Sequence, residues 1–238
     1  TMALPCSSLA FRRPMSAPER PHWTRQIVAR LLYLVPLKAF GTMAFMALFF
    51  WGYFGVLRFP LAPATVMPQI AVDAWIPFSS LAFPAYASLW VYASLPPALL
   101  REFRTLALFG VWIAAMCLFC LGLFWLFPTA VPPSGIDWSL YPEMAVIKTV
   151  DAGGNACPSL HVAAAVFAAL WLDRICLAIG SPGWLRWLNV LQCLAILWST
   201  VATRQHVVLD VLAGLVVGLA FALPALRHAT GSLRAERI

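Results

Sequence analysis

Long uncharged, apolar stretches constrain this chain more than any other feature of its sequence. A transmembrane helix needs about 17–25 mostly apolar residues, and six stretches reach or approach that length. They lie at 39–57, 74–100, 106–127, 158–179, 187–202 and 207–226. Prolines interrupt the second stretch, and Asp173-Arg174 interrupts the fourth. We therefore predict an all-α integral membrane protein, a bundle of six transmembrane helices.

The composition agrees with this prediction and excludes several soluble classes. Hydrophobic residues make up 62% of the chain, charged residues 11%, and the mean hydropathy is +0.84. A soluble domain carries about 25% charged residues. An ordinary cytosolic enzyme, a disordered tail and a secreted disulfide scaffold are therefore excluded. The net charge of +7 does not indicate a nucleic-acid partner, because the basic residues are scattered among apolar runs.

The distribution of lysine and arginine predicts the orientation, because cytoplasmic loops of membrane proteins collect these residues. If both termini are cytoplasmic, thirteen of the 16 Lys and Arg residues fall inside, and only Arg58, Lys148 and Arg204 fall outside. We predict a cytoplasmic (inner) membrane location, with residues 128–157 forming a long outer loop.

The chain divides into three predicted parts. Residues 1–36 form a cytoplasmic N-terminal segment, residues 37–226 the transmembrane domain, and residues 227–238 a cytoplasmic tail. Within the first part, 24–35 mixes arginines with an apolar stripe and is typical of a helix in the membrane interface. An ordinary extension of the first span is an equal alternative.

Placing an ionisable side chain inside a membrane costs free energy, so such a residue indicates a functional site. His206 and Asp210 are four residues apart and share one helical face. The carboxylate can fix the imidazole tautomer and leave the other nitrogen free as a nucleophile. His161 begins the fourth stretch, where a helix N-terminus suits a phosphate group. Arg204, with Lys148 and Arg58 as further candidates, supplies cations for an anionic substrate.

These residues carry a resemblance to a known family. Pro158-Ser159-Leu160-His161 resembles the P-S-x-H signature of the type 2 phosphatidic acid phosphatase superfamily. The run 199–210 (STVATRQHVVLD) resembles its third signature, S-R-x5-H-x3-D. The resemblance implies that His206 attacks phosphorus, Asp210 orients it and His161 protonates the leaving group. It also implies phosphate binding by Ser159 with backbone amides, and it assigns Ser199 and Thr200 to signature positions that bind phosphate.

The chain departs from the family pattern at two places. Thr200 stands where the third signature has arginine, and Arg204 lies closer to the histidine instead. The first signature, K-x6-R-P, is absent, since Asn155-Ala156 follows Lys148 at the matching distance. The pattern is most similar to the inositolphosphotransferase and phosphorylceramide-synthase-like branch, which includes enzymes that transfer a phosphoryl headgroup to an alcohol.

The sequence therefore predicts an enzyme that acts on a lipid-linked phosphate at the outer membrane face. Its expected partners are the lipid substrate and the bilayer, with no metal and no cofactor. One alternative is a lipid phosphotransferase with an alcohol as acceptor, and another is a non-enzymatic transporter or scaffold. Two smaller features have structural interpretations: we expect Gly214 and Gly218 to permit close helix packing, and Cys117 and Cys120 to be packing residues.

Overall fold

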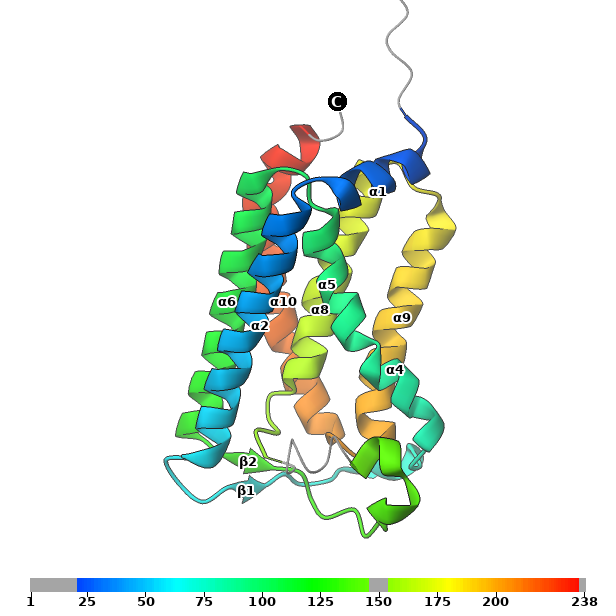
Figure 1. The fold of residues 1–238 in the computed structure, drawn as a ribbon. Helices are drawn as coiled ribbons and strands as arrows, with labels where there is room; N and C mark the ends of the chain where they lie inside the picture. The colour runs from blue at the N-terminus through cyan, green and yellow to red at the C-terminus, as the bar shows by residue number, and fades with distance from the viewer. Residues whose placement is uncertain (1–20, 146–153, 236–238) are drawn as a thin grey trace, which may run out of the picture.

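The computed structural model describes residues 21–145 and 154–235, which form a helical bundle with a small sheet at one end (Figure 1). The α-helices are α1 (Trp23–Leu32), α2 (Val35–Arg58), α3 (Ala71–Trp75), α4 (Phe83–Ala87), α5 (Leu89–Leu99), α6 (Phe103–Leu126), α8 (Leu160–Ala178), α9 (Gly183–Ala202) and α10 (Val208–Ala235). Two 3-10 helices, Ser80–Ala82 and Trp138–Leu140, and two strands, β1 (Thr65–Val66) and β2 (Thr129–Ala130), complete the described elements.

Five helices in the described part of the chain are long and apolar enough to cross a membrane, and they coincide with five of the six predicted spans. They are α2, α6, α8, α9 and α10. The predicted fold class, an α-helical multi-pass membrane protein, is confirmed at this level. A total of six spans stays a prediction.

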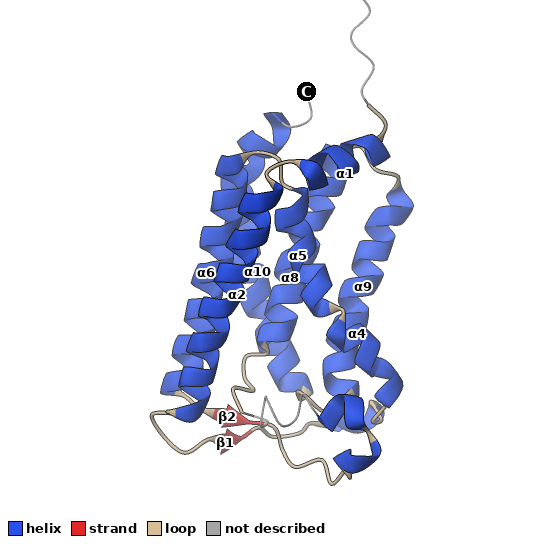
Figure 2. Cartoon of the chain, in the orientation of Figure 1, coloured by secondary structure: helices blue, strands red, loops and turns tan. Residues whose placement is uncertain are grey.

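The predicted second span is not a single helix. Its residues form α3, a 3-10 turn, α4 and α5, with α4 and α5 meeting at Ser88. Prolines explain the breaks, because proline lacks an N–H donor and its ring clashes with the preceding turn. Pro84 begins α4, and Pro96 and Pro97 lie within α5. In Figure 2, α4 and α5 follow one another along the length of the bundle beside α8 and α9.

The helix expected at 24–35 is separate from the first span. Leu34 adopts a left-handed conformation, with φ of 54°, and this turn lets α1 lie across the end of the bundle (Figure 1). The Lys38 ammonium is buried. Its Nζ donates to the carbonyl oxygens of Arg30 and Ala98, both at 2.7 Å. Lys38 therefore ties α1 and α5 together.

Helix α8 is the centre of the bundle. Its Phe167 and Trp171 are fully buried and contact Phe109 of α6, with ring centroids 5.4 and 5.3 Å apart. The helix ends at Ala178, and the φ of 68° at Gly180 permits a Schellman turn in which Ser181 N donates to Cys176 O at 3.0 Å. Four helices, α5, α6, α9 and α10, contact α8.

The glycine pair in α10 confirms the predicted close packing. A Cβ at Gly214 would collide with the Ser159 carbonyl oxygen, and one at Gly218 would lie 2.8 Å from the Ala163 carbonyl oxygen. Only glycine permits this approach of α10 to α8. The contact brings the beginning of α8 next to the beginning of α10.

The sheet lies at the end of the bundle opposite α1 and the C-terminus (Figure 1). Strands β1 and β2 pair in parallel, with Thr65 opposite Thr129. Ala130 also forms a bridge with Gly154, so the segments after α2 and α6 and the one before α8 are held together. Residues 128–145 and 154–157 of the predicted outer loop therefore lie at one end of the bundle, the end at which α8 and α10 begin.

Candidate active site

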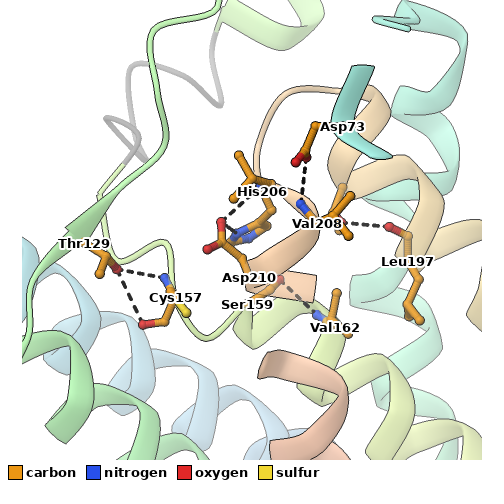
Figure 3. Close-up of polar contacts among 11 residues, drawn as sticks. Asp73, Thr129, Cys157, Ser159, Val162, Leu197, His206, Val208 and Asp210 are labelled. Carbon is orange, nitrogen blue, oxygen red and sulfur yellow. Dashed lines mark hydrogen bonds and ion pairs between the residues drawn. The ribbon is translucent and has the colours of Figure 1, made fainter. Parts of the chain in front are cut away.

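His206 lies in the turn between α9 and α10, and the backbone of that turn fixes its position. The amides of Gln205 and His206 both donate to the Thr200 carbonyl oxygen, at 3.0 and 3.1 Å. The His206 side chain is 6% exposed, and Asp210 is fully buried. The Asp210 Oδ2 atom lies 3.4 Å from His206 Nδ1 and accepts a 3.0 Å hydrogen bond from Val207 N (Figure 3). Asp210 therefore holds both the helix start and the imidazole.

Neither ring nitrogen of His206 has a hydrogen-bond partner among the described residues, and both are buried. Nδ1 lies at ion-pair distance from Asp210, so Nε2 is the nitrogen that is left for a ligand. Buried polar atoms are normally paired. An unpaired imidazole nitrogen backed by a carboxylate on the other side is the arrangement that a nucleophilic histidine requires.

His161 faces His206 from the first turn of α8. The two ring centroids are 5.7 Å apart, and the ring planes are inclined by 60°. The Ser159 side chain caps α8, since its Oγ accepts from Val162 N at 3.3 Å (Figure 3). Ser159 N in turn donates to the Asp210 carbonyl oxygen at 3.0 Å. The starts of the two helices are therefore directly joined, and the predicted trio of His161, His206 and Asp210 comes together.

Tyr86 is a site residue that the sequence did not reveal. Its hydroxyl and His161 Nε2 share a 2.8 Å hydrogen bond, and the two rings lie 4.8 Å apart between centroids. Tyr86 is only 2% exposed. In the sequence, the only indication of Tyr86 was a hydroxyl group among the prolines of an apolar stretch. Its partner, His161, lies 75 residues away in the chain.

Asp73 is a second residue that the sequence did not reveal. Its Oδ1 accepts from Val208 N and its Oδ2 from Ile70 N, both at 2.8 Å. The side chain is 3% exposed. Because Val208 is the first residue of α10, Asp73 caps the helix that follows His206 (Figure 3). In the sequence, the only indication that Asp73 belongs to the site was a single acidic residue beside a long apolar stretch.

Two of the predicted phosphate ligands have hydroxyl groups that are already hydrogen-bonded within α9. The Ser199 and Thr200 hydroxyls are buried and donate to carbonyl oxygens within α9, those of Ile196 and Leu197, at 2.7 and 2.8 Å. Phosphate binding by these two and by the capping residue Ser159 stays a prediction. Lys148 lies outside the described residues.

Arg204 lies on the same turn as His206, half-buried, with a left-handed φ of 55°. Its backbone N donates to the Val201 carbonyl oxygen at 2.9 Å. The described residues that line the cavity at the histidines do not include Arg204. Its role as a phosphate clamp stays a prediction.

A cavity of about 510 Å³ opens beside the two histidines. His161, His206, Tyr86 and Asn155 line one end, and the rest of the wall is mainly apolar side chains of α2, α5, α6 and α8. A site that combines a few polar groups with an apolar wall is typical of ligand pockets.

Cys157 lies beside Asp210 in the loop before α8 (Figure 3). Burial, with a further contribution from the Asp210 carboxylate, raises the pKa of the Cys157 thiol to about 11. The thiol is therefore neutral at physiological pH and is a poor nucleophile. Cys117 and Cys120 are buried and free, in agreement with a packing role. No three His, Cys, Asp or Glu side chains gather into a possible metal site in the part of the chain that the structure describes.

A known protein family matches the part of the chain that contains the two histidines. A family model described as the PAP2 superfamily matches residues 74–223, which include α8, α9 and all three residues of the trio. No curated protein and no solved structure matches the chain. The superfamily predicted from the signatures is confirmed, whereas its inositolphosphotransferase-like branch stays a prediction.

Proposed function

The chain belongs to the PAP2 superfamily, and on this premise we propose that it transfers the phosphoryl group of a lipid phosphate through a covalent intermediate on His206. Membership in this superfamily indicates a phosphatase-type enzyme or a phosphotransferase acting on phosphate esters. The observation that carries the finer proposal is the pair of rings of His206 and His161, 5.7 Å apart between centroids, which line one cavity, with His206 Nε2 buried and without a hydrogen-bond partner among the described residues.

In the first step the lone pair of His206 Nε2 attacks phosphorus. The N–P bond forms as the P–O bond to the leaving alcohol breaks, and His161 donates a proton to the departing oxygen. Asp210 Oδ2, 3.4 Å from His206 Nδ1, stabilises the positive charge that develops on the ring. Tyr86 holds the His161 ring in place through its 2.8 Å hydrogen bond.

In the second step His161, now without its proton, acts as a general base. It removes a proton from the incoming hydroxyl, whose oxygen attacks phosphorus while the N–P bond breaks. The acceptor is water in a phosphatase and an alcohol in a phosphotransferase. The unpaired N–H groups at the start of α8, the Ser159 hydroxyl and the Arg204 guanidinium are the proposed partners of the phosphoryl oxygens.

The apolar cavity wall supports a lipid as the substrate. A soluble phosphate ester gains nothing from such a wall, whereas burial of a hydrocarbon chain contributes about 25 cal/mol for each Å² removed from water. The five candidate spans support a multi-pass membrane location for the enzyme. We place the site at the outer face of the cytoplasmic membrane, because the cation bias assigns the opposite end of the bundle to the cytoplasm.

Phosphate release by the purified protein in detergent tests this function. A panel of phosphatidate, prenyl phosphates, prenyl pyrophosphates and phosphorylated sphingolipids is incubated with and without an alcohol acceptor. Released orthophosphate identifies a phosphatase, and a phosphorylated alcohol identifies a phosphotransferase. Absence of both products, and of any acid-labile phosphoprotein, contradicts the proposal and favours a transporter or scaffold.

A further inference from the structure

The cavity at the histidines continues as a groove deep into the bundle. Beyond the polar end, its wall includes Phe45 of α2, Ala93 of α5, Ile113 of α6 and Ala164 of α8. The same cavity reaches Lys38, near the beginning of α2. One continuous space thus runs from the candidate phosphate site along the bundle, enclosed by four helices.

The depth of this groove follows from the helix that lines it. Tyr53 of α2 is near the catalytic end, since its carbonyl oxygen accepts from Asn155 Nδ2 at 3.5 Å. Gly41, also in the groove wall, precedes it by twelve residues, which is about 18 Å along the helix axis. Half of the hydrocarbon core of a bilayer is about 15 Å thick. The groove continues past Gly41 to Lys38, so it is deeper than one leaflet.

Two glycines, one on α2 and one on α6, lie at the same level of the groove. Helices α2 and α6 run in the same direction, since each leads into one strand of the parallel β1–β2 pair. A Cβ at Gly52 would lie 3.3 Å from Leu121 Cδ1, which puts these residues at one level. Gly41 and Gly110 each lie eleven residues earlier. They therefore share one level, and both line the groove.

Neither glycine is required by packing. A Cβ added at Gly41 or at Gly110 meets no heavy atom within 4 Å, in contrast to Gly214 and Gly218 of α10. A glycine in a helix interior is destabilising by roughly 0.5–1 kcal/mol relative to alanine. Two such positions at one level of a continuous groove keep its deep part open.

We propose that this groove binds a single hydrocarbon tail of the phosphate substrate, and that Gly41 and Gly110 set the longest tail that it accepts. This inference rests on the proposed function, because the tail is that of the molecule whose phosphate lies between His161 and His206. The apolar wall recognises the chain, and the glycine level determines how far the chain extends. The activity then increases with tail length until the groove is filled.

Leucine substitutions test the length limit. We expect kcat/KM of the unaltered protein to rise from octyl to dodecyl to hexadecyl phosphate. Gly41→Leu and Gly110→Leu should lower the hexadecyl value relative to the octyl value by about fourfold for each methylene kept from the groove. Gly55→Leu on α2 and Gly122→Leu on α6 are matched controls, because a Cβ there also meets open space and neither lines the groove. Equal length profiles in all five proteins overturn the proposal.

Photolabelling tests the tail site without turnover. A dodecyl phosphate with a diazirine on its terminal carbon should label the groove, at positions such as Phe45 or Ile113. Excess dodecyl phosphate should suppress the labelling more strongly than dodecanol, which has the tail without the phosphate. Labelling confined to outward-facing Trp51 and Leu118, which are 81% and 68% exposed, overturns the proposal.

The two readouts separate this inference from the proposed function. Groove labelling without phosphate release or transfer supports the tail site and contradicts the catalytic proposal. Phosphate release with a flat length profile in every variant supports catalysis and contradicts the tail site.

Discussion

The Asp210 Oδ2 atom lies 3.4 Å from His206 Nδ1 and also accepts a hydrogen bond from the Val207 amide. One carboxylate therefore contacts both the first turn of α10 and the ring that precedes it. Its second oxygen, Oδ1, is buried without a hydrogen-bond partner among the described residues. The contact with His206 is at ion-pair distance.

The first prediction concerns this pair. Asp210→Asn should lower kcat by about 10³–10⁴-fold, because an amide can neither favour the required tautomer nor stabilise the imidazolium. Single-turnover phosphate release measures the change. Cys157→Ala, which alters a neutral neighbour of Asp210, is the control and should retain most activity. Near-normal turnover of Asp210→Asn would remove Asp210 from the mechanism.

The two histidines should have different defects. His206→Ala should abolish the acid-labile phosphoprotein formed with a labelled substrate. His161→Ala should reduce the rate by roughly 10²–10⁴-fold for an alkyl leaving group, and much less for a nitrophenyl leaving group, which needs no proton. Equal and complete loss for both variants on every ester would contradict this division of roles.

Arg204 should bind the transferred phosphoryl group. Arg204→Ala should lose most activity, and Arg204→Lys should recover only part of it, because an ammonium lacks the planar fork of donors. Arg58→Ala, at the exposed end of α2, is the control. Lys148→Ala should have a smaller effect than Arg204→Ala. If Arg204→Ala were nearly normal while Arg58→Ala or Lys148→Ala were inactive, another cation would hold the phosphate.

Gly214 should be intolerant of any side chain. Gly214→Ala puts a methyl group against the Ser159 carbonyl oxygen and should lower stability by about 1–3 kcal/mol. Thermal unfolding in detergent measures this loss. Gly55→Ala, in a helix but with open space around the added methyl group, should be neutral or slightly stabilising. Similar melting temperatures for the two variants would contradict the packing described above.

Asp73 should act as a positioning residue for His206. Asp73→Ala leaves the Val208 and Ile70 amides without acceptors. We expect kcat to fall by about 10–100-fold, since a small displacement at a catalytic group has an effect of this order, and KM to change little. Asp73→Asn, which keeps one acceptor oxygen, should restore part of the activity. Asp137→Ala removes an exposed acidic cap and should have no effect. A change in KM alone would contradict the positioning role.

The predicted spans agree with the structure where the length of the apolar stretch alone determines the helix. Helices α2, α6 and α10 are uninterrupted over most of their length, so bilayer thickness determines their extent. The stretch 74–100 satisfies the same criterion on average, but Pro84, Pro96 and Pro97 divide it locally. The mean hydropathy of a stretch does not show where a proline, which has no backbone N–H donor, interrupts the helix.

The predicted site succeeded where residues are close in sequence. His206 and Asp210 follow from helical periodicity, and His161 from its position at the start of a helix. Tyr86 and Asp73 did not follow, because their partners lie 75 and 135 residues away. Lys38 shows the same limit, because its carbonyl partners, Arg30 and Ala98, lie in other helices. Only the packed bundle brings these groups together.

The 135-residue separation between Asp73 and Val208 has a consequence for the biogenesis of the protein. Chains are made and folded from the N-terminus, so Asp73 emerges from the ribosome long before its partner. The proposed nucleophile, its carboxylate and the glycine face that covers α8 all belong to the last described helix and the turn before it. On the proposed function, we therefore expect activity only after the hairpin of α9 and α10 is inserted, and none in shorter nascent chains.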